Sequence, residues 1–309
     1  MKKIFIDGSV GTTGLRIAER LAQRTDLEII SLPEEIRKDD LARKKALNSC
    51  DVAFLCLPDP AAISAVEMIE SPNVTVIDAS TAHRTDDGWC YGFPELSDEI
   101  KNNLANSKRI AVPGCHASGF IALVYPLIEA GLISADTKLT CHSVTGYSGG
   151  GKKMIAEYEA EGRNVLLDAP RQYGLTQQHK HLKEMKAITG LSNEPVFCPI
   201  VSDFYSGMMV TVPLFSSDLL KGGIEDVKAL YKKKYNTDIV KYRENIGDGA
   251  FISAHEKMNK DSMDITVYGN DDRFILVAVY DNLGKGASGA AVECLNYVLG
   301  VDPKTGLEI

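Results

Sequence analysis

Short apolar runs alternate with amphipathic segments along the first 115 residues of the chain. The apolar runs predict β-strands at residues 2–7, 27–32, 51–57, 74–80 and 109–114. The segments between them predict α-helices at residues 12–23, 39–50 and 60–70. Nearly unbroken apolar strands that alternate with helices are typical of a parallel sheet covered on both faces. The pattern therefore predicts a Rossmann-type, doubly wound α/β sheet.

The pattern changes from about residue 135, where the strands become longer and partly alternate between apolar and polar positions. These strands are predicted at residues 137–146, 194–204, 205–215, 262–270 and 273–282. Partial alternation is typical of an antiparallel or mixed sheet with one exposed face, so this region is predicted to be α+β. The last apolar segment, residues 284–300, predicts a helix that can return to the first domain. The second domain would then be an insertion.

Composition limits the classes of function that the chain can have. A length of 309 residues allows two domains, and 44% hydrophobic with 25% charged residues is ordinary for a soluble protein. A net charge of −8, with the basic residues dispersed, argues against nucleic-acid binding. No apolar run approaches the ~20 residues of a membrane span. Seven cysteines without a C-x-x-C pair indicate a reducing cytoplasm rather than a disulfide framework.

Three glycines separate the first predicted strand from the first predicted helix. Glycine permits a tight turn and a close approach of backbone N–H groups to a pyrophosphate at a helix N-terminus. The spacing is G-x-x-G-x-x-G rather than the usual G-x-G-x-x-G, and a plain turn is the alternative, but the strand–turn–helix context favours dinucleotide binding. The candidate cofactor-binding residues here are Gly8, Val10, Gly11, Thr12, Thr13 and Gly14.

The end of the second predicted strand bears on the choice between NAD and NADP. An acidic residue there commonly binds the ribose 2′-hydroxyl of NAD. This chain has Ser31 at that point, followed by Arg37 and Lys38. The basic pair favours the 2′-phosphate of NADP, although the same charges are also compatible with a solvated helix end.

Cys115 follows Pro-Gly at the carboxyl end of a predicted parallel strand, at the start of a predicted helix. Ligands bind at this edge of open α/β sheets, and a helix N-terminus lowers the pKa of a thiol. A small buried hydrophobe, a metal ligand and a disulfide half are the alternatives. The position beside a nucleotide site favours a nucleophile.

Other segments offer a general base for such a thiol and groups that could bind an anionic substrate. His179 and His181 form an H-x-H on a predicted strand or loop, and either imidazole could be the general base. A metal site there is weakly supported, because no matching cluster of acids or cysteines accompanies the pair. The candidate anion-binding groups are Ser80, Arg84, Ser148, Lys152 and Lys153. The remaining histidines, at 83, 116, 142 and 255, are interpreted as structural.

Several motifs together resemble those of the N-acetyl-gamma-glutamyl-phosphate reductases, in their shorter (type 2) subfamily. The motifs are FIDGSVGTTG, DASTAHR, YGFPEL, VPGCHASG, TGYSGGGKK, YGLTQQHKH and DNLGKGASGAA, in order from residue 5 to 291. The resemblance implies a dinucleotide-binding domain from residues 1–115 and 285–309, and a catalytic and oligomerisation domain from 116–284. It implies NADPH-dependent reduction of N-acetyl-glutamyl 5-phosphate to the 5-semialdehyde, in a homodimer or homotetramer.

The resemblance also assigns roles to individual residues. Cys115 would be the nucleophile that forms a thioester, and His179 the base. Substrate contacts would come from Arg84, Ser148, Lys152 and His181, and further cofactor contacts from Ser31, Arg37, Ser80, Asn282, Gly286 and Ala287. The family commonly has Pro-Glu after the second histidine, where this chain has Lys183-Glu184, so the geometry of that segment is open.

Three alternatives remain at this point. An aspartate-semialdehyde dehydrogenase would share the glycine turn and the cysteine corner, but its substrate carries an ammonium group in place of the acetamide. A non-catalytic NADP-binding regulator would not need a strand-end cysteine together with an H-x-H. A zinc enzyme would contain bound metal.

Overall fold

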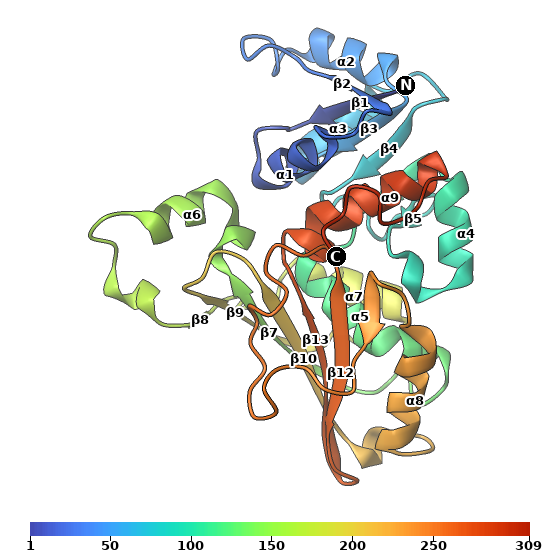
Figure 1. Ribbon diagram of the computed structural model, residues 1–309, viewed down its shortest axis with the longest axis vertical. Coiled ribbons are helices and arrows are strands. Elements are labelled where there is room, and N and C mark those ends of the chain that lie inside the picture. The colour runs from blue at the N-terminus through green and yellow to red at the C-terminus, as the bar shows by residue number, and fades with distance from the viewer. The chain divides into compact units, whose positions relative to one another are not determined.

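The computed structural model describes residues 1–309, which divide into two compact units. The first unit consists of Met1–Pro113 and Ala287–Leu307, and the second of Gly114–Gly286 and Glu308–Ile309. Figure 1 gives the chain course of each unit. No helix in the structure is both long enough and apolar enough to pass through a bilayer.

The first unit is built on a six-stranded sheet in which every strand pair is parallel. The strands are β1 (Lys2–Asp7), β2 (Leu27–Ile30), β3 (Val52–Leu55), β4 (Thr75–Asp78), β5 (Cys90–Tyr91) and β6 (Arg109–Ala111). Their spatial order is β2-β1-β3-β4-β6-β5. The chain therefore leaves β1 toward β2 on one side and returns to β3 on the other. Such a reversal opens a crevice at the carboxyl ends of β1 and β3, where open α/β sheets bind ligands.

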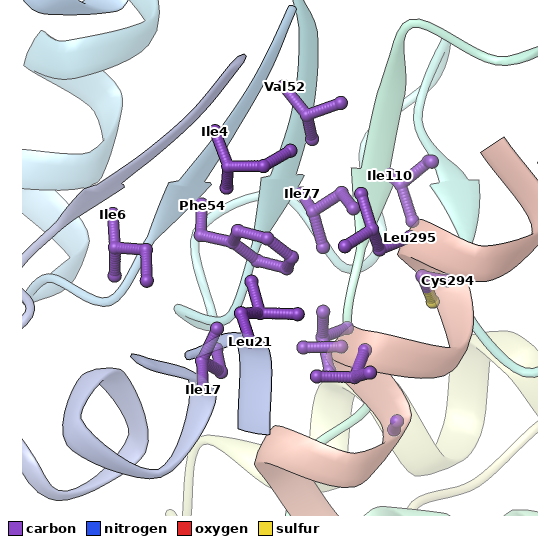
Figure 2. Close-up of a cluster of buried hydrophobic side chains, with 14 of the residues drawn as sticks. Ile4, Ile6, Ile17, Leu21, Val52, Phe54, Ile77, Ile110, Cys294 and Leu295 are labelled. Carbon is purple, nitrogen blue, oxygen red and sulfur yellow. The ribbon is translucent and has the colours of Figure 1, made fainter. Parts of the chain in front are cut away.

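Helices cover both faces of this sheet, as the apolar strands predicted. They are α1 (Thr12–Leu21), α2 (Asp40–Ser49), α3 (Asp59–Glu67), α4 (Asp98–Asn106), the 3₁₀-helix η1 (Pro94–Leu96) and α9 (Gly289–Leu299). On one face, Ile17 and Leu21 of α1 and Leu295 of α9 pack with Ile4 and Phe54 of the strands (Figure 2). On the other face, side chains of α2 and α3 pack against alternate strand residues. Each fully buried large apolar side chain contributes about 1.5–3 kcal/mol.

The second unit contains a mixed seven-stranded sheet with the order β11-β12-β13-β10-β7-β9-β8. Its strands are β7 (Thr140–Gly146), β8 (Arg171–Gln172), β9 (Val196–Ser202), β10 (Met208–Phe215), β11 (Val240–Tyr242), β12 (Met263–Gly269) and β13 (Arg273–Tyr280). Its helices are α5 (Cys115–Glu129), α6 (Gly151–Glu159), α7 (His181–Thr189) and α8 (Ile224–Lys234). Short turns of helix complete it: η2 (Tyr147–Gly150), η3 (Val165–Asp168), η4 (Ser216–Asp218) and the π-turn η5 (Gly284–Ser288).

Helix α5 is the central element of the second unit. It is buried along nearly its whole length and packs against β10, β13, α7 and α8. Pro126 inside it has no N–H, so the carbonyl of Ala122 loses its normal helical donor. The Tyr235 hydroxyl of α8 donates to that carbonyl at 2.6 Å. This bond satisfies a buried acceptor and fixes the helix that begins at Cys115.

Candidate active site

The glycine turn of the first unit has the geometry of a phosphate-binding loop. Gly8 has a φ of +86°, and a Cβ there would lie 2.3 Å from the carbonyl oxygen of Cys56. A Cβ on Gly14 would lie 2.4 Å from the carbonyl oxygen of Gly8. Gly11 is the N-cap of α1, and the N–H groups of Thr12 and Thr13 that follow have no acceptor within the helix. These residues leave space and donors for an anion.

A pocket of about 650 Å³ lies beside this turn. Its lining combines apolar side chains, such as Val10, Leu15 and Leu32, with cationic ones. The residues of the lining that matter for a dinucleotide are Asp7, Gly8, Ser9, Val10, Gly11, Ser31, Arg37, Lys38 and Arg43. The pocket thus joins the turn after β1 to the segment after β2, where the sequence placed Ser31 and Arg37.

Arg43 is the cation in this pocket that the sequence analysis did not single out. Its guanidinium donates to both carboxylate oxygens of Asp7, the closest contact being 2.9 Å, and to Asp40 at 3.0 Å. Burial alone would lower the pKa of Arg43, but the bonds to Asp7 raise it. Arg43 and Asp7 therefore form a part-buried ion pair at the end of β1, in which each charge compensates the other. Arg37 pairs with the exposed Glu34 at 2.9 Å.

Two other predicted ligands of the first unit make hydrogen bonds to residues of the same unit. The Ser80 hydroxyl donates to Asp78 at 2.7 Å and accepts the N–H of Ala82. The Arg84 guanidinium donates to the main-chain carbonyls of Val112 at 2.8 Å and Ala79 at 3.2 Å. Both side chains hold the turn that follows β4. Their roles toward cofactor and substrate stay predictions.

Cys115 is the first residue of α5 and is half-buried. The N–H of the preceding Gly114 donates to the buried carboxylate of Glu184 on α7 at 2.8 Å. The Tyr280 hydroxyl donates to the carbonyl of Cys115 at 2.5 Å and accepts the N–H of Gly119 at 3.0 Å. A Cβ on Gly286 would lie 3.2 Å from the Cβ of Cys115. Three segments therefore surround the backbone that carries the thiol, at a helix end that favours the thiolate.

A cluster of imidazoles lies beside this corner. The ring of His116 is 5.8 Å from that of His179 and 5.7 Å from that of His181, and the last two are 4.7 Å apart. His179 lies in the loop before α7, whereas His181 is the first residue of α7, so only His179 matches the predicted strand or loop. Residues 181–189 form a helix that ends at Gly190, whose φ of +78° stops it.

His179 has a defined tautomer in this arrangement. Its Nδ1 accepts the N–H of His181 at 3.2 Å, so the neutral ring carries its proton on Nε2. Burial and the charge of Lys180 lower the pKa of His179, which keeps the ring neutral at pH 7. A neutral imidazole with its proton on Nε2 is a donor at that atom. To accept a proton there, the ring would first have to give up its bond from His181.

The remaining predicted residues lie in the segments that follow β7 and β13, and all of them except Ala287 belong to the second unit. The Asn282 amide donates to Ser148 Oγ at 3.0 Å and accepts the N–H of Gly207 at 2.9 Å, so these two predicted ligands are in contact. Lys152 is exposed in the first turn of α6. The N–H of Gly286 donates to the Asp281 carbonyl, and Ala287 is half-buried. No group of three or more His, Cys, Asp or Glu side chains is arranged to hold a metal ion.

Two family descriptions match the chain in the order of its units. "Semialdehyde dehydrogenase, NAD binding domain" matches residues 3–103, and "Semialdehyde dehydrogenase, dimerisation domain" matches residues 115–282. The N-acetyl-gamma-glutamyl-phosphate reductase 2 of Nostoc sp. is 43% identical over 99% of both chains. The N-acetyl-gamma-glutamyl-phosphate reductase of Chelativorans sp. is 44% identical over 96% of this chain and 98% of its own.

The chain belongs to the N-acetyl-gamma-glutamyl-phosphate reductases of the semialdehyde dehydrogenase family. The resemblance seen in the sequence motifs is thereby confirmed, and the chain is an oxidoreductase that uses a nicotinamide cofactor.

Solved structures show the same fold at low identity. Aspartate semialdehyde dehydrogenase II of Vibrio cholerae, complexed with ASA, has a TM-score of 0.72 at 17% identity and covers 97% of this chain and 98% of its own. Aspartate semialdehyde dehydrogenase with NADP from Candida albicans has a TM-score of 0.67 at 14% identity, covering 97% of this chain and 100% of its own.

Proposed function

We propose that this chain catalyses the NADPH-dependent reduction of N-acetyl-L-glutamyl 5-phosphate to N-acetyl-L-glutamate 5-semialdehyde and phosphate, in arginine biosynthesis. The observation that carries the proposal is Cys115 at the first position of α5, followed by His116, whose ring lies 5.8 Å from the ring of His179 and 5.7 Å from that of His181. The relatives named for this reaction match nearly the whole chain. We also propose a cytoplasmic location, on the cysteine usage described above.

The cysteine sulfur performs the first step of the proposed mechanism. The Cys115 thiolate attacks the acyl carbon, the C–O bond to phosphate breaks, and a thioester to Cys115 remains. Main-chain N–H groups at the start of α5 stabilise the oxyanion of the tetrahedral intermediate. The chemistry that a bound nicotinamide cofactor would supply is hydride donation to the acyl carbon of this thioester, which would give the aldehyde. Cys115 then leaves as a thiolate, ready for another cycle.

The proton balance assigns a role to His179. The departing phosphate takes up one proton near neutral pH, and no other group of the products needs one. We propose that His179 takes up the thiol proton of Cys115 when the thiolate forms, and that the resulting imidazolium gives a proton to the leaving oxygen and returns to its neutral form. One proton from solvent restores the cysteine–histidine pair before the next turnover. Ser148, Lys152 and His181 remain the proposed anion contacts, with Arg84 from the first unit. Asn282, Gly286 and Ala287 remain proposed cofactor contacts.

We propose NADP rather than NAD as the cofactor. Arg37 and Lys38 line the pocket together with Ser31, and no acidic residue closes β2. The one carboxylate in the lining, Asp7, is neutralised by Arg43. A 2′-phosphate would find positive charge here, whereas a free 2′-hydroxyl would find no carboxylate acceptor. The cradle between Gly8 and Gly14 supports binding of the pyrophosphate.

We further propose that the chain forms a homodimer through the second unit. Helices cover one face of its sheet, while the other face leaves apolar side chains exposed: Val196, Phe215 and Ile275 are 56%, 58% and 38% exposed. The strand register places these three residues on the same face. An apolar surface of this kind is typical of a protein–protein interface. A second copy of the chain would cover it.

Phosphate-dependent reduction of NADP with two aldehydes tests the substrate. N-acetylglutamate semialdehyde should be oxidised with a kcat/KM at least 100-fold above that of aspartate semialdehyde. An acetamide is recognised by hydrogen bonds, whereas the ammonium group of aspartate semialdehyde requires an acidic partner. A preference for aspartate semialdehyde would overturn the proposal in favour of the related dehydrogenase. NADP binding without turnover of either aldehyde would favour a regulator.

A further inference from the structure

Three side chains beside Cys115 form a continuous hydrogen-bonded chain. His116 Nδ1 lies 2.7 Å from the Ser143 hydroxyl, and His116 Nε2 lies 2.5 Å from the Tyr173 hydroxyl. Ser143 is fully buried in β7, and His116 is buried in the first turn of α5. The main-chain N–H of Tyr173 donates to the carbonyl of Pro199 in β9. The chain therefore links the central strands to the helix that carries the thiol.

The imidazole in the middle of this chain is neutral. Burial, with the neighbouring His179, lowers the pKa of His116 to about 3. A neutral ring has one N–H donor and one acceptor nitrogen, so the donors in this series of hydrogen bonds can point in only two directions. Either Tyr173 donates to His116, which donates to Ser143, or Ser143 donates to His116, which donates to Tyr173.

Burial of Ser143 decides between these directions. In the first direction the Ser143 proton would need another acceptor, and the hydroxyl makes no other hydrogen bond in its fully buried position. A buried donor without an acceptor is unfavourable and rare. In the second direction the Ser143 proton and the His116 proton both have an acceptor. His116 then donates to Tyr173, and the phenolic proton is free to point into the half-buried site.

The Tyr173 hydroxyl lies 2.5 Å from the ring of His116, the residue that directly follows the nucleophile in α5. Burial and the charge of a Cys115 thiolate raise the pKa of Tyr173, so the phenol stays protonated throughout the neutral range. A neutral O–H group near a thiolate is a hydrogen-bond donor to it, and bonds to a charged acceptor are the stronger ones. Other titratable groups around the corner are His179, His181, Glu184 and Tyr280.

We propose that Tyr173 donates a hydrogen bond to the Cys115 thiolate, and that His116 and Ser143 are positioning residues that orient the phenol. The inference rests on Cys115 being the nucleophile of the proposed function. No covalent bond forms or breaks in this step, and the proton stays on the phenol oxygen. The bond favours the thiolate over the thiol, so it increases the fraction of Cys115 that can attack.

Alkylation of Cys115 by iodoacetamide as a function of pH tests the inference without substrate. Peptide mass spectrometry distinguishes Cys115 from the other cysteines. Tyr173→Phe removes the donor and should raise the apparent pKa of Cys115 by about one unit, which is roughly tenfold less thiolate at neutral pH. Turnover should fall mainly through kcat rather than KM. An unchanged alkylation profile in Tyr173→Phe would overturn the inference.

Two further variants separate orientation from general loosening of the helix. Ser143→Ala removes the group that sets the direction of the chain, so it should raise the apparent pKa of Cys115 by less than Tyr173→Phe does. It should add nothing in the Tyr173→Phe background, because Ser143 acts only through the phenol; an additive effect would contradict that role. Tyr235→Phe is the matched control. It removes another tyrosine hydroxyl that donates to α5, at the carbonyl of Ala122, and it should leave alkylation of Cys115 unchanged.

The same experiment distinguishes failure of the inference from failure of the proposed function. If wild-type Cys115 alkylates no faster than an ordinary thiol, both the nucleophile and its donor are wrong. If wild-type Cys115 is reactive at neutral pH and Tyr173→Phe matches it, only the role of Tyr173 is wrong.

Discussion

Two glycines in the turn after β1 should respond differently to alanine substitution, one by losing stability and the other by losing cofactor affinity. Gly14 lies in the first turn of α1, where alanine normally stabilises a helix by about 1 kcal/mol. Here the added Cβ would lie 2.4 Å from the Gly8 carbonyl oxygen and 2.9 Å from the Ser9 Cα. Both neighbours are backbone atoms, so α1 must shift, and overpacking of this kind costs about 1–3 kcal/mol or more. Gly14→Ala should therefore lower the free energy of unfolding despite its better helix propensity.

Gly11 provides the matched control in the same turn. Its φ is −73°, and a Cβ there would approach the Gly8 carbonyl oxygen only to 3.5 Å. Loss of a glycine N-cap should cost no more than about 1 kcal/mol. The new methyl group would enter the pocket where we place the pyrophosphate. Gly11→Ala should therefore fold normally but bind NADPH at least tenfold more weakly.

Urea unfolding and NADPH titration measure these two effects separately. Trp89, the only tryptophan, lies in the first unit, so its fluorescence reports unfolding of the unit that contains both glycines. NADPH fluorescence gives the Kd. A Gly14→Ala variant as stable as the wild type, or more stable, would refute the steric argument. Wild-type NADPH affinity in Gly11→Ala would refute the placement of the pyrophosphate.

Three other predictions follow from the pocket, the imidazole cluster and the open sheet face. Arg37→Ala should reduce the ratio of kcat/KM for NADPH to that for NADH by about tenfold or more, and an unchanged ratio would mean that Arg37 does not contact the 2′-phosphate. His116 has a folded-state pKa of about 3, below its unfolded value of 6.5, so the unfolded chain binds more protons between these values and stability falls as the pH falls. From pH 6.5 to pH 5 this loss should be about 2 kcal/mol, and His116→Asn should show a correspondingly flatter dependence in urea unfolding. Phe215→Lys should convert the dimer to a monomer in light scattering, whereas a dimer of wild-type mass would mean that another surface forms the interface.

Much of the fold could be predicted from the sequence because burial leaves a simple signature. The strands of the parallel sheet are buried on both faces, so runs such as residues 52–55 are continuously apolar. Helix α7 was not predicted, although Leu182, Met185 and Thr189 lie on its buried side. It is short, and its intervening residues are charged, so the helical period was difficult to recognise in residues 181–189.

The site was predictable where one segment carries the chemistry and not where distant segments meet. Cys115 and the glycine turn are local motifs. Arg43 becomes a pocket cation only because Asp7, 36 residues earlier, lies beside it across β1 and α2. His116 was interpreted as structural because its partners come from distant segments of the second unit: Ser143 lies in β7, and Tyr173 directly follows β8. Such pairings follow from tertiary packing, which a single sequence does not display.

The central claim is that Cys115 carries the acyl group during turnover, and mass spectrometry of the quenched enzyme tests it most directly. Enzyme mixed with N-acetyl-glutamyl 5-phosphate in the absence of nucleotide should show one acyl group on the peptide that contains Cys115. Cys115→Ser should show none and should retain less than about a tenth of wild-type turnover, a barrier change above ~1.4 kcal/mol. An acyl group on another residue, or rapid turnover by Cys115→Ser, would contradict the account.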